Sequence, residues 1–506
     1  MKNLQPLIYA ILIAIGMYLG SLNNIYQISV DSKINNILQI IHEHYVDSVN
    51  YTTFENDAIN SILNELDPHS SYISIKNVKA VEEDMQGSFS GIGVEFNIIK
   101  DSIVVVSPIS GGPSEKLGIQ SGDRIISVEK ENVASIGIKN DGVIKRLRGE
   151  KGSTVNIIIK RRGQDDLIPY SILRDDIPLH SIDAGIILNN DIAYIKINRF
   201  AATTYEEMME KVTDLQTKGM QKIILDFRGN PGGYLHIANQ ICDEFLKLGE
   251  LIVFTEGRNR RKQETFATQN GSLENIDVIA LINEGSASAS EIVSGALQDN
   301  DRGTVIGRRS FGKGLVQEQI SLNDGSIMRL TTQRYYTPSG RCIQKNYGKD
   351  VKNYYLEQYT RSDTSEYYPD SLKYTTKKGR IVYGGGGITP DIIIERDTNV
   401  NYLKINKMMS KGWINEFCFE ESELLRKQNL NTYKQIKTAN IYTNFKQYLR
   451  QKDSQFELIL GHTELKYLKN LLLATISRNL WDNDIYYEIL SQEDEYIKRA
   501  INEFEK

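Results

Sequence analysis

The sequence predicts an α/β core, a β-rich module inserted before it, N-terminal helices and a C-terminal helical extension. Three observations lead to this fold class. The chain has 506 residues, which at roughly 100–200 residues per domain suggests about three folded units. Strand-like and helix-like segments alternate after residue 182, as βα units do. Glycine and β-branched residues dominate between residues 87 and 161, where short strands are expected.

The chain opens with an apolar segment from Leu7 to Gly20, and residues 1–24 are predicted to be a membrane anchor or a signal segment. Residues 6–22 would extend about 25 Å as a helix, the short end for a membrane span. Lys2 precedes the segment, so the positive-inside rule places the rest of the chain outside the cytoplasm. Because YLGSLNN is a poor A-x-A site, an uncleaved anchor is favoured over a cleaved signal peptide or a buried helix.

A helical region is predicted for residues 30–82, because apolar residues recur there at three- to four-residue spacing until Asp67-Pro68. The β-rich module follows at 84–172, with strands expected at 87–99, 102–109, 123–133 and 154–161 and a short helix from Pro113 to Leu117.

The α/β core is predicted over residues 180–398. Its expected strands are 193–200, 222–227, 277–283, 304–307 and the closing GGGGITPDI at 384–392, with helices at 205–219, 234–249 and 286–298. Residues 400–506 form the helical extension, with Leu468 and Leu472 on one helix face. Its helices would pack on the core, dimerise or bind a partner, and the sequence leaves these alternatives open.

Composition excludes several classes of protein. Charged residues make up 25% and hydrophobic residues 40%, so the chain is neither disordered nor a multi-span membrane protein. The net charge of −5 argues against a general nucleic-acid binder. The scattered Cys242, Cys342 and Cys418 exclude a disulfide scaffold and a CxxC zinc site. His42 and His44 lie in a helix-like stretch where positions two apart diverge, so no metal is expected.

Two strand ends of the core carry groups suited to acyl transfer. RGNPGG at 228–233 follows one strand, and its glycines free backbone N–H groups to face a ligand. EGSASASE at 284–291 follows another strand and starts a helix, whose N-terminal potential favours an oxyanion. The structural alternatives are that Ser288 and Glu291 form only a helix capping box and that RGNPGG is only a tight turn.

Other catalytic arrangements have less support. The G-x-S-x-G of α/β-hydrolases is absent. A Ser-His-Asp triad stays open on spacing, although His236 lies in an apolar helix and His180 in a linker. Ser310-Phe-Gly-Lys313 matches the S-x-x-K of penicillin-binding enzymes, but glycines flank the lysine and no K-T-G follows.

Several motifs together resemble the C-terminal processing peptidases, also called tail-specific proteases. In chain order they are LDPHSSY at 66–72, LDFRGNPGG at 225–233, VIALINEGSASASEIVSGALQDNDRGTVIG at 278–307, RRSFGKGLVQ at 308–317 and GGGGITPD at 384–391. The resemblance implies a crotonase- or Clp-protease-like core with serine endopeptidase activity and no cofactor. It implies that Ser288 is the nucleophile, Lys313 the general base and Gln317 the residue that orients the lysine. The implied oxyanion donors are backbone N–H groups, those of Ala289 and of Gly232 or Gly233.

A lysine base sets physical requirements. Desolvation must lower its pKa from near 10.4 to about 7–8, which costs roughly 3–5 kcal/mol. No acidic residue should reach the amine, so Glu318, the nearest carboxylate in sequence, must point away. In an extended strand Lys313 and Gln317 would lie about 13 Å apart, so the segment must turn for them to meet.

The β-rich module resembles a PDZ domain, most clearly in GPSEKLGIQSGDRIISV at 112–128, although a small β-barrel without a ligand would fit the same strands. The resemblance implies a carboxylate-binding loop, whose residues are Gly91, Ile92, Gly93 and Val94. A PDZ groove binds an extended C-terminus by strand addition.

These inferences predict a single-pass protein of the bacterial inner membrane whose catalytic part lies in the periplasm. It would bind protein substrates with free apolar C-termini and cleave them with Ser288 as the nucleophile. A second copy or an adaptor is left open as a partner, and no nucleic acid is expected. The alternative function is a non-catalytic PDZ scaffold that presents tails to another protease.

Overall fold

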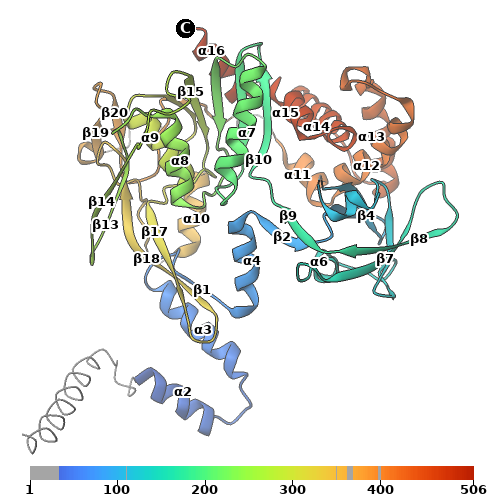
Figure 1. Cartoon of the computed structure of the whole chain (residues 1–506), viewed down its shortest axis with the longest axis horizontal. Coiled ribbons are helices and arrows are strands. Elements are labelled where there is room, and N and C mark those ends of the chain that lie inside the picture. Colours follow the sequence, from blue (N-terminus) through green and yellow to red (C-terminus); the bar gives the residue numbers. More distant parts are fainter. Residues whose placement is uncertain (1–32, 110, 349, 362–368, 397–400) are drawn as a thin grey trace, which may run out of the picture.

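The computed structural model describes residues 33–109, 111–348, 350–361, 369–396 and 401–506 (Figure 1). The predicted anchor, residues 1–24, lies outside the described residues. Within the described ranges, no helix combines the length and the apolar character needed to cross a membrane.

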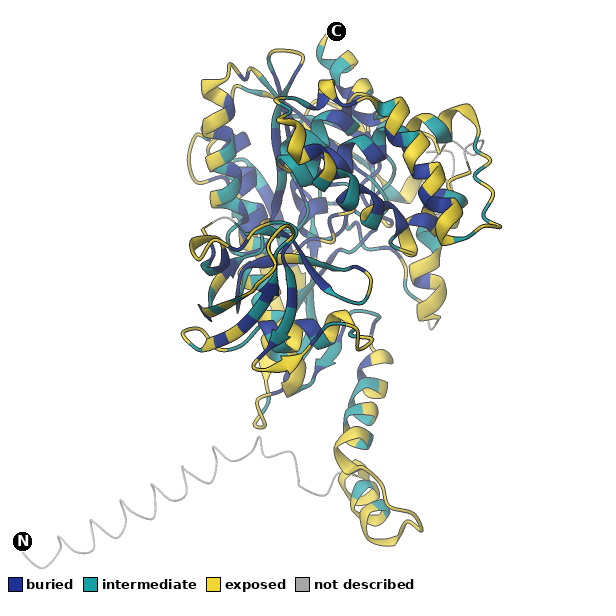
Figure 2. Ribbon diagram, turned by 90° about the vertical axis from the view of Figure 1, so that its right-hand side faces the viewer, coloured by how far each residue is buried: buried dark blue, intermediate teal, exposed yellow. Residues whose placement is uncertain are grey.

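The N-terminal region is less uniformly helical than predicted. It comprises α2 (Lys33–His44), α3 (Tyr51–Asn64), β1 (Ser71–Ile73) and α4 (Ile75–Gln86). Helix α2 buries no residue and α3 buries only Leu63, and Figure 2 shows both as largely exposed. The LDPHSSY segment ends in strand β1 because this strand pairs antiparallel with β18 (Ile327–Tyr336) of the core.

The β-rich module is a twisted sheet with one short and one longer helix. Its elements are β3 (Val94–Ile98), β4 (Ile103–Pro108), α5 (Pro113–Lys116), β5 (Arg124–Val128), β6 (Glu131–Asn132), α6 (Asn140–Leu147), β7 (Thr154–Lys160) and β8 (Leu167–Leu173). The strand order is β3-β4-β5-β7-β8, with β6 beside β5, so β3 is an edge strand. A ribbon of β2 (Ser88–Gly91) and β9 (Asp175–Pro178) joins the module to the core (Figure 1).

The core sheet follows the predicted βα alternation. Its strands are β10 (Ile182–Leu188), β11 (Ile192–Ile197), β12 (Lys222–Asp226), β15 (Asp277–Ile282), β16 (Thr304–Gly307) and β21 (Ile392–Ile393), in that order. The sheet is parallel from β11 to β21, and β10 is antiparallel. The predicted strand at 384–392 is wrong in extent, since the glycines form loop and β21 has two residues.

Three helices cover one face of this sheet: α7 (Thr204–Thr217), α8 (Leu235–Phe245) and α9 (Ala289–Asp299). The side chains of β15 alternate in direction, as expected for a strand. Val278 and Ile282 belong to the apolar cluster under these helices, whereas Ile279 and Leu281 belong to the cluster on the opposite face.

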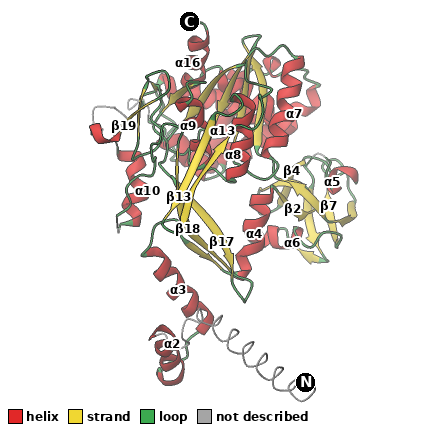
Figure 3. Ribbon diagram, turned by 60° about the vertical axis from the view of Figure 1, so that its left-hand side comes forward, coloured by secondary structure: helices red, strands yellow, loops and turns green. Residues whose placement is uncertain are grey.

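A second, antiparallel sheet was not predicted. It contains β13 (Leu251–Gly257), β14 (Arg260–Phe266), β17 (Leu315–Ser321) and β18, with β1 at one edge (Figure 3). Strand β14 has no buried residue and four basic or acidic residues, so it carries no apolar signal. Beside the core lie α10 (Val351–Thr360), β19 (Lys373–Thr375) and β20 (Ile381–Tyr383).

In its described part, residues 401–506, the C-terminal extension is built from six α-helices and two short 3-10 helices, Arg426–Gln428 and Tyr433–Gln435. The α-helices are α11 (Leu403–Ser410), α12 (Trp413–Leu425), α13 (Thr438–Lys452), α14 (His462–Leu480), α15 (Asn483–Ser491) and α16 (Glu495–Phe504). Helix α16 covers the second face of the core sheet, where Tyr496 and Ile497 pack in one cluster with Ile279 and Leu281. Of the alternatives left open by the sequence, packing on the core is therefore observed.

The same extension also contacts the β-rich module. Phe419 of α12 is buried in a cluster with Ile99, Val104 and Val106 of the module. The Lys100 ammonium lies 2.7 Å from a carboxylate oxygen of Glu420. Figure 1 shows α11 to α14 beside the module, and the extension thus contacts both other units.

Candidate active site

Ser288 stands where strand β15 gives way to helix α9. It is the N-cap residue of α9 and has φ 54° and ψ −112°, a conformation that residues with a Cβ rarely adopt. The hydroxyl of Tyr335, a fully buried residue, donates to the Ser288 carbonyl at 3.2 Å. A strained backbone held by its surroundings is a feature that clusters at functional sites.

The two neighbouring serines of the GSASASE segment have structural bonds. Ser286 Oγ donates to the Phe227 carbonyl at 2.8 Å, and Ser290 Oγ donates to the Asn230 carbonyl at 3.0 Å. Both residues are fully buried, whereas Ser288 is only partly buried. Ser288 is therefore the serine of the three that is open to solvent.

The RGNPGG turn lies directly against Ser288. A Cβ added to Gly232 would meet Ser288 Cβ at 2.8 Å and the Ala289 nitrogen at 2.9 Å, so only glycine allows this approach. The Gly232 N–H donates to Asn230 Oδ1 at 2.8 Å. The N–H of Gly232 is thus already bonded within the turn. Of the two predicted glycine donors to an oxyanion, the N–H of Gly233 is therefore the better candidate to act with that of Ala289.

Asn230 connects the two turns. Its carbonyl accepts the Ala287 N–H at 2.9 Å, and its amide donates to the Ile197 carbonyl at 2.9 Å. Asn230 is fully buried, so each of these bonds is made where water cannot replace it.

Glu291 joins the predicted nucleophile turn, residues 284–291, to the FGKG loop, residues 311–314. One of its carboxylate oxygens accepts the N–H groups of both Ser288, at 2.8 Å, and Lys313, at 2.9 Å. The other oxygen accepts from Ser310 Oγ at 2.5 Å and from the Gly312 N–H at 2.7 Å. The sequence predicted Glu291 only as a capping residue, but in the fold it also brings the backbone of Lys313 beside that of Ser288.

The Lys313 and Gln317 side chains meet without the expected turn, because Lys313 lies two residues before β17 and Gln317 lies within this strand. The Lys313 ammonium lies 3.0 Å from Gln317 Oε1. The pairing of β17 with β18 shifts register between Val316 and Gln317, so the strand is irregular between these two residues. Glu318 points elsewhere and pairs with Arg260 at 2.8 Å.

Burial and, after it, the charge of Arg329 together lower the pKa of Lys313 from 10.5 to about 8. The charges of Glu291 and Asp67 oppose this shift from a distance. Neither carboxylate bonds to the amine itself, whose hydrogen-bond partner is the neutral amide of Gln317. The effect of desolvation on the pKa of Lys313 therefore outweighs that of the two carboxylates.

The LDPHSSY segment forms a wall of this site, which sequence reasoning did not foresee. Gln317 Nε2 donates to the His69 carbonyl at 2.5 Å, and Asp67 Oδ1 accepts the His69 N–H at 2.8 Å. Burial, and then the charge of Lys313, lower the pKa of His69 to about 4, so its ring is neutral near pH 7. The sequence signal for this wall is the LDPHSSY motif, which supports the family resemblance but does not indicate a role in the site.

The predicted carboxylate-binding loop runs from the last residue of β2, Gly91, to the first residue of edge strand β3, Val94. The Ile92 carbonyl accepts from Ser114 N–H at 3.1 Å, and the Gly93 carbonyl accepts from Ile109 N–H at 3.0 Å. Gly93 has φ +73° and packs against Ile177 of β9. All four residues of the loop are buried, and the capture of a carboxylate there stays a prediction.

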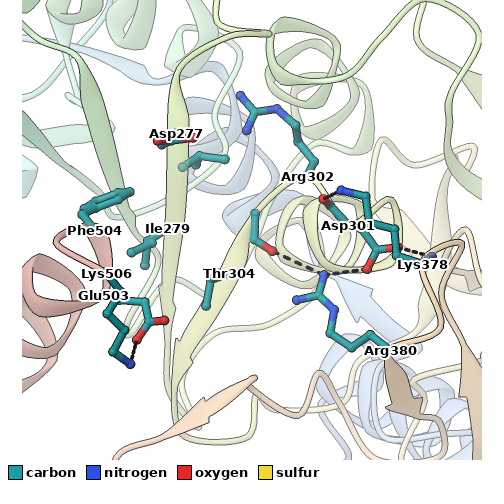
Figure 4. A pocket seen from close by; sticks show the side chains of 12 residues that line it. Asp277, Ile279, Asp301, Arg302, Thr304, Lys378, Arg380, Glu503, Phe504 and Lys506 are labelled. Carbon is teal, nitrogen blue, oxygen red and sulfur yellow. Dashed lines mark hydrogen bonds and ion pairs between the residues drawn. The ribbon is translucent and has the colours of Figure 1, made fainter.

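A separate cavity of about 490 Å³ lies at the opposite end of the core sheet. Its wall includes Asp277 and Thr304, the first residues of β15 and β16, whereas Ser288 follows the carboxyl end of β15. Figure 4 shows charged side chains of both signs around it, including Arg380, which pairs with Asp301 at 3.2 Å. Arg302, another cation of its wall, donates to the backbone carbonyls of Phe245, Leu273 and Ile276. The cavity therefore lies apart from the groups described above.

Comparison with known proteins places this site in a family. The model of peptidase family S41 matches residues 191–353, and a PDZ domain model matches residues 90–169. The carboxy-terminal-processing protease of Bartonella bacilliformis is 37% identical over 318 residues, which are 62% of this chain and 72% of that protein. The chain belongs to the carboxy-terminal processing proteases of peptidase family S41.

Other proteins also show similarity to this chain. The carboxy-terminal processing protease CtpB of Bacillus subtilis is 34% identical over 62% of this chain and 65% of its own length. A solved photosystem II D1 C-terminal processing protease has 23% identity and a TM-score of 0.36, and it covers 73% of this chain and 88% of that one. The family assignment confirms the predicted resemblance, including the PDZ domain.

Proposed function

We propose that this protein is a serine endopeptidase in which Ser288 is the nucleophile and Lys313 the general base. The observation that carries the proposal is the setting of Lys313. Its amine is desolvated, has a pKa lowered to about 8 and contacts the neutral amide of Gln317. The backbone N–H groups of Lys313 and Ser288 both donate to the same carboxylate oxygen of Glu291. A neutral lysine near pH 8 is suited to accept the serine proton.

In the proposed acylation step, Lys313 Nζ accepts the proton of Ser288 Oγ as this oxygen attacks the carbonyl carbon of the peptide bond. The carbonyl oxygen becomes an oxyanion, which the N–H groups of Ala289 and Gly233 would stabilise at the N-terminus of α9. The C–N bond then breaks, the leaving amine takes the proton from Lys313, and an ester with Ser288 remains.

In deacylation Lys313 would act in the same way, with water in place of Ser288 as the nucleophile. Lys313 accepts a proton from water as the water oxygen attacks the ester carbonyl. The C–O bond to Ser288 breaks, Ser288 Oγ regains the proton, and the new C-terminal carboxylate leaves. No metal ion or cofactor enters these steps, and the core would have the crotonase- or Clp-protease-like arrangement.

We further propose that the PDZ domain recognises the substrate tail. Edge strand β3 has one side available for strand addition, next to the Gly91-Ile92-Gly93-Val94 loop. A free, apolar C-terminus is the ligand that this arrangement suits. The proposed setting is the bacterial inner membrane, with residues 1–24 as the anchor and the described units in the periplasm.

The test is proteolysis of an unstructured protein such as casein by the purified protein. Ser288→Ala and Lys313→Ala should each abolish cleavage, and the double variant should be no less active than either, because the two residues act as one unit. Ser290→Ala, which changes a serine two positions away, is the matched control and should keep measurable activity. Full activity of Lys313→Ala would contradict the lysine-base mechanism. A wild-type protein that binds tails but never cleaves would instead be a scaffold.

A further inference from the structure

Helix α16 of the C-terminal extension reaches the first residue of the RGNPGG turn (228–233), which we call the oxyanion turn. This residue is Arg228, whose side chain is 18% exposed and pairs with Asp226 at 2.6 Å and with Asp494 at 2.8 Å. Asp494 caps α16 by accepting the Tyr496 N–H at 2.9 Å. One carboxylate of the extension therefore both starts α16 and holds the arginine.

The ring of Tyr496 lies between arginines of two catalytic loops. Its centroid is 4.6 Å from the guanidinium carbon of Arg228 and 5.4 Å from that of Arg308. Arg308 in turn donates to Glu284, the residue at the start of the nucleophile turn, at 3.0 Å. Tyr496 thus contacts one arginine of the RGNPGG turn and one that shortly precedes the FGKG loop.

Charge balance shows why Asp494 matters. Asp226 is fully buried and is shared by two cations, Arg228 and Lys196, the latter at 3.3 Å, while Tyr194 also donates to it at 2.8 Å. Without Asp494, two positive charges would face one negative charge in a largely desolvated site. A buried charge without a counter-charge is costly, so the turn would rearrange to let Arg228 reach water.

We propose that Asp494 and Tyr496 are positioning residues for the oxyanion turn. They fix Arg228, and through it the Asn230-Pro231-Gly232-Gly233 segment, against Ser288 and Ala289. The extension is then part of the catalytic unit, although none of its residues touches the reacting atoms. This inference rests on the proposed peptidase function and assigns a role to the extension, which the sequence left open.

The test compares two substitutions of neighbouring acidic residues in the full chain. Asp494→Asn removes the charge but keeps a residue that caps a helix N-terminus about as well as Asp does. Its control is Glu493→Gln, since Glu493 pairs with Lys466 and Lys498 and not with Arg228. Both are measured for kcat and KM on a peptide substrate, for thermal midpoint and for binding of a free peptide tail.

Asp494→Asn should lower kcat and kcat/KM together by about 2- to 30-fold, the range seen for residues that act through a network. KM and tail binding should stay close to those of Glu493→Gln, whereas the thermal midpoint should fall below that of Glu493→Gln, because Arg228 loses a counter-charge. Tyr496→Leu should show the same selective loss, and Tyr496→Phe, which keeps the ring face, should restore activity. A merely structural role would change the thermal midpoint without separating kcat from KM.

The outcomes separate this inference from the proposed function. If the wild type cleaves, Ser288→Ala does not, and Asp494→Asn matches Glu493→Gln in kcat, the positioning role is wrong and the peptidase function stands. If the wild type does not cleave at all, both are wrong. If Asp494→Asn does not fold, the pair Tyr496→Leu and Tyr496→Phe decides, and equal kcat values for these two would overturn the proposal.

Discussion

Lys313 lies in surroundings that cost the fold stability. Lowering its pKa from 10.5 to about 8 corresponds to about 3 kcal/mol at roughly 1.4 kcal/mol per unit. Because the charged amine is disfavoured in the fold, this cost is fully present below pH 8 and disappears as the pH rises through 10.5. Ser288 adds the strain of its positive φ. Both costs fall on the residues proposed to act, as expected where function conflicts with stability.

A substitution can recover part of this cost. Lys313→Met should raise the free energy of unfolding at pH 7, by up to about 3 kcal/mol less the lost contact with Gln317, and should abolish activity. The gain should shrink between pH 8 and pH 10.5. Urea denaturation at pH 7 and pH 10 measures it, and a variant that is less stable than the wild type at pH 7 would show that the amine is not desolvated.

At the scale of elements, the site depends on how helix α9 and the FGKG loop are joined. Glu291 of α9 accepts four hydrogen bonds, from Ser288, Ser310, Gly312 and Lys313, and burial raises the pKa of its carboxyl despite them. An ionised carboxylate can accept at both oxygens, whereas an amide has only one. The loop therefore depends on a carboxylate at this position.

Glu291→Gln should lower both activity and stability. The amide NH₂ would face N–H and O–H donors, and each buried donor left without an acceptor costs about 1–3 kcal/mol. We expect kcat to fall at least about tenfold, with a lower thermal midpoint, because about 1.4 kcal/mol corresponds to a factor of ten. Glu318→Gln, which affects a more exposed pair with Arg260, is the control. Equal activity of the two variants would refute the joining role of Glu291.

The sequence predicted some elements better than others. The βα alternation and both turns of the candidate site follow from apolar strands and glycine-rich turns, which are local signals. The second sheet was missed because β14 is exposed and polar, and because β1 pairs with a strand far along the chain. The packing of α16 and the contact of Asp494 with Arg228 are likewise long-range, and no spacing in the sequence marks them.

At the scale of the whole molecule, the extension contacts the PDZ domain through Phe419 and the core through α16. The PDZ domain is also joined to the core by the β2–β9 ribbon. Tail binding is therefore best measured on the whole chain, in which these contacts are intact.

A free tail carboxylate should decide this binding. In Ser288→Ala protein, amidation of a peptide C-terminus should weaken affinity roughly 10- to 150-fold, because a charge-assisted hydrogen bond contributes about 1.5–3 kcal/mol. Calorimetry with matched free and amidated peptides measures the difference. If the two peptides bind equally, the domain does not capture carboxylates and serves as a spacer.

The central claim is that Lys313 acts as a neutral base on Ser288, and the pH dependence of kcat/KM between pH 5 and pH 10 tests it most directly. The free enzyme should gain activity along a single ionisation near pH 8, since burial lowers the pKa of Lys313 to about 8 and the pKa of His69 to about 4. Lys313→Arg should be inactive throughout, because guanidinium stays protonated. An activity plateau that extends down to pH 5 would contradict the account.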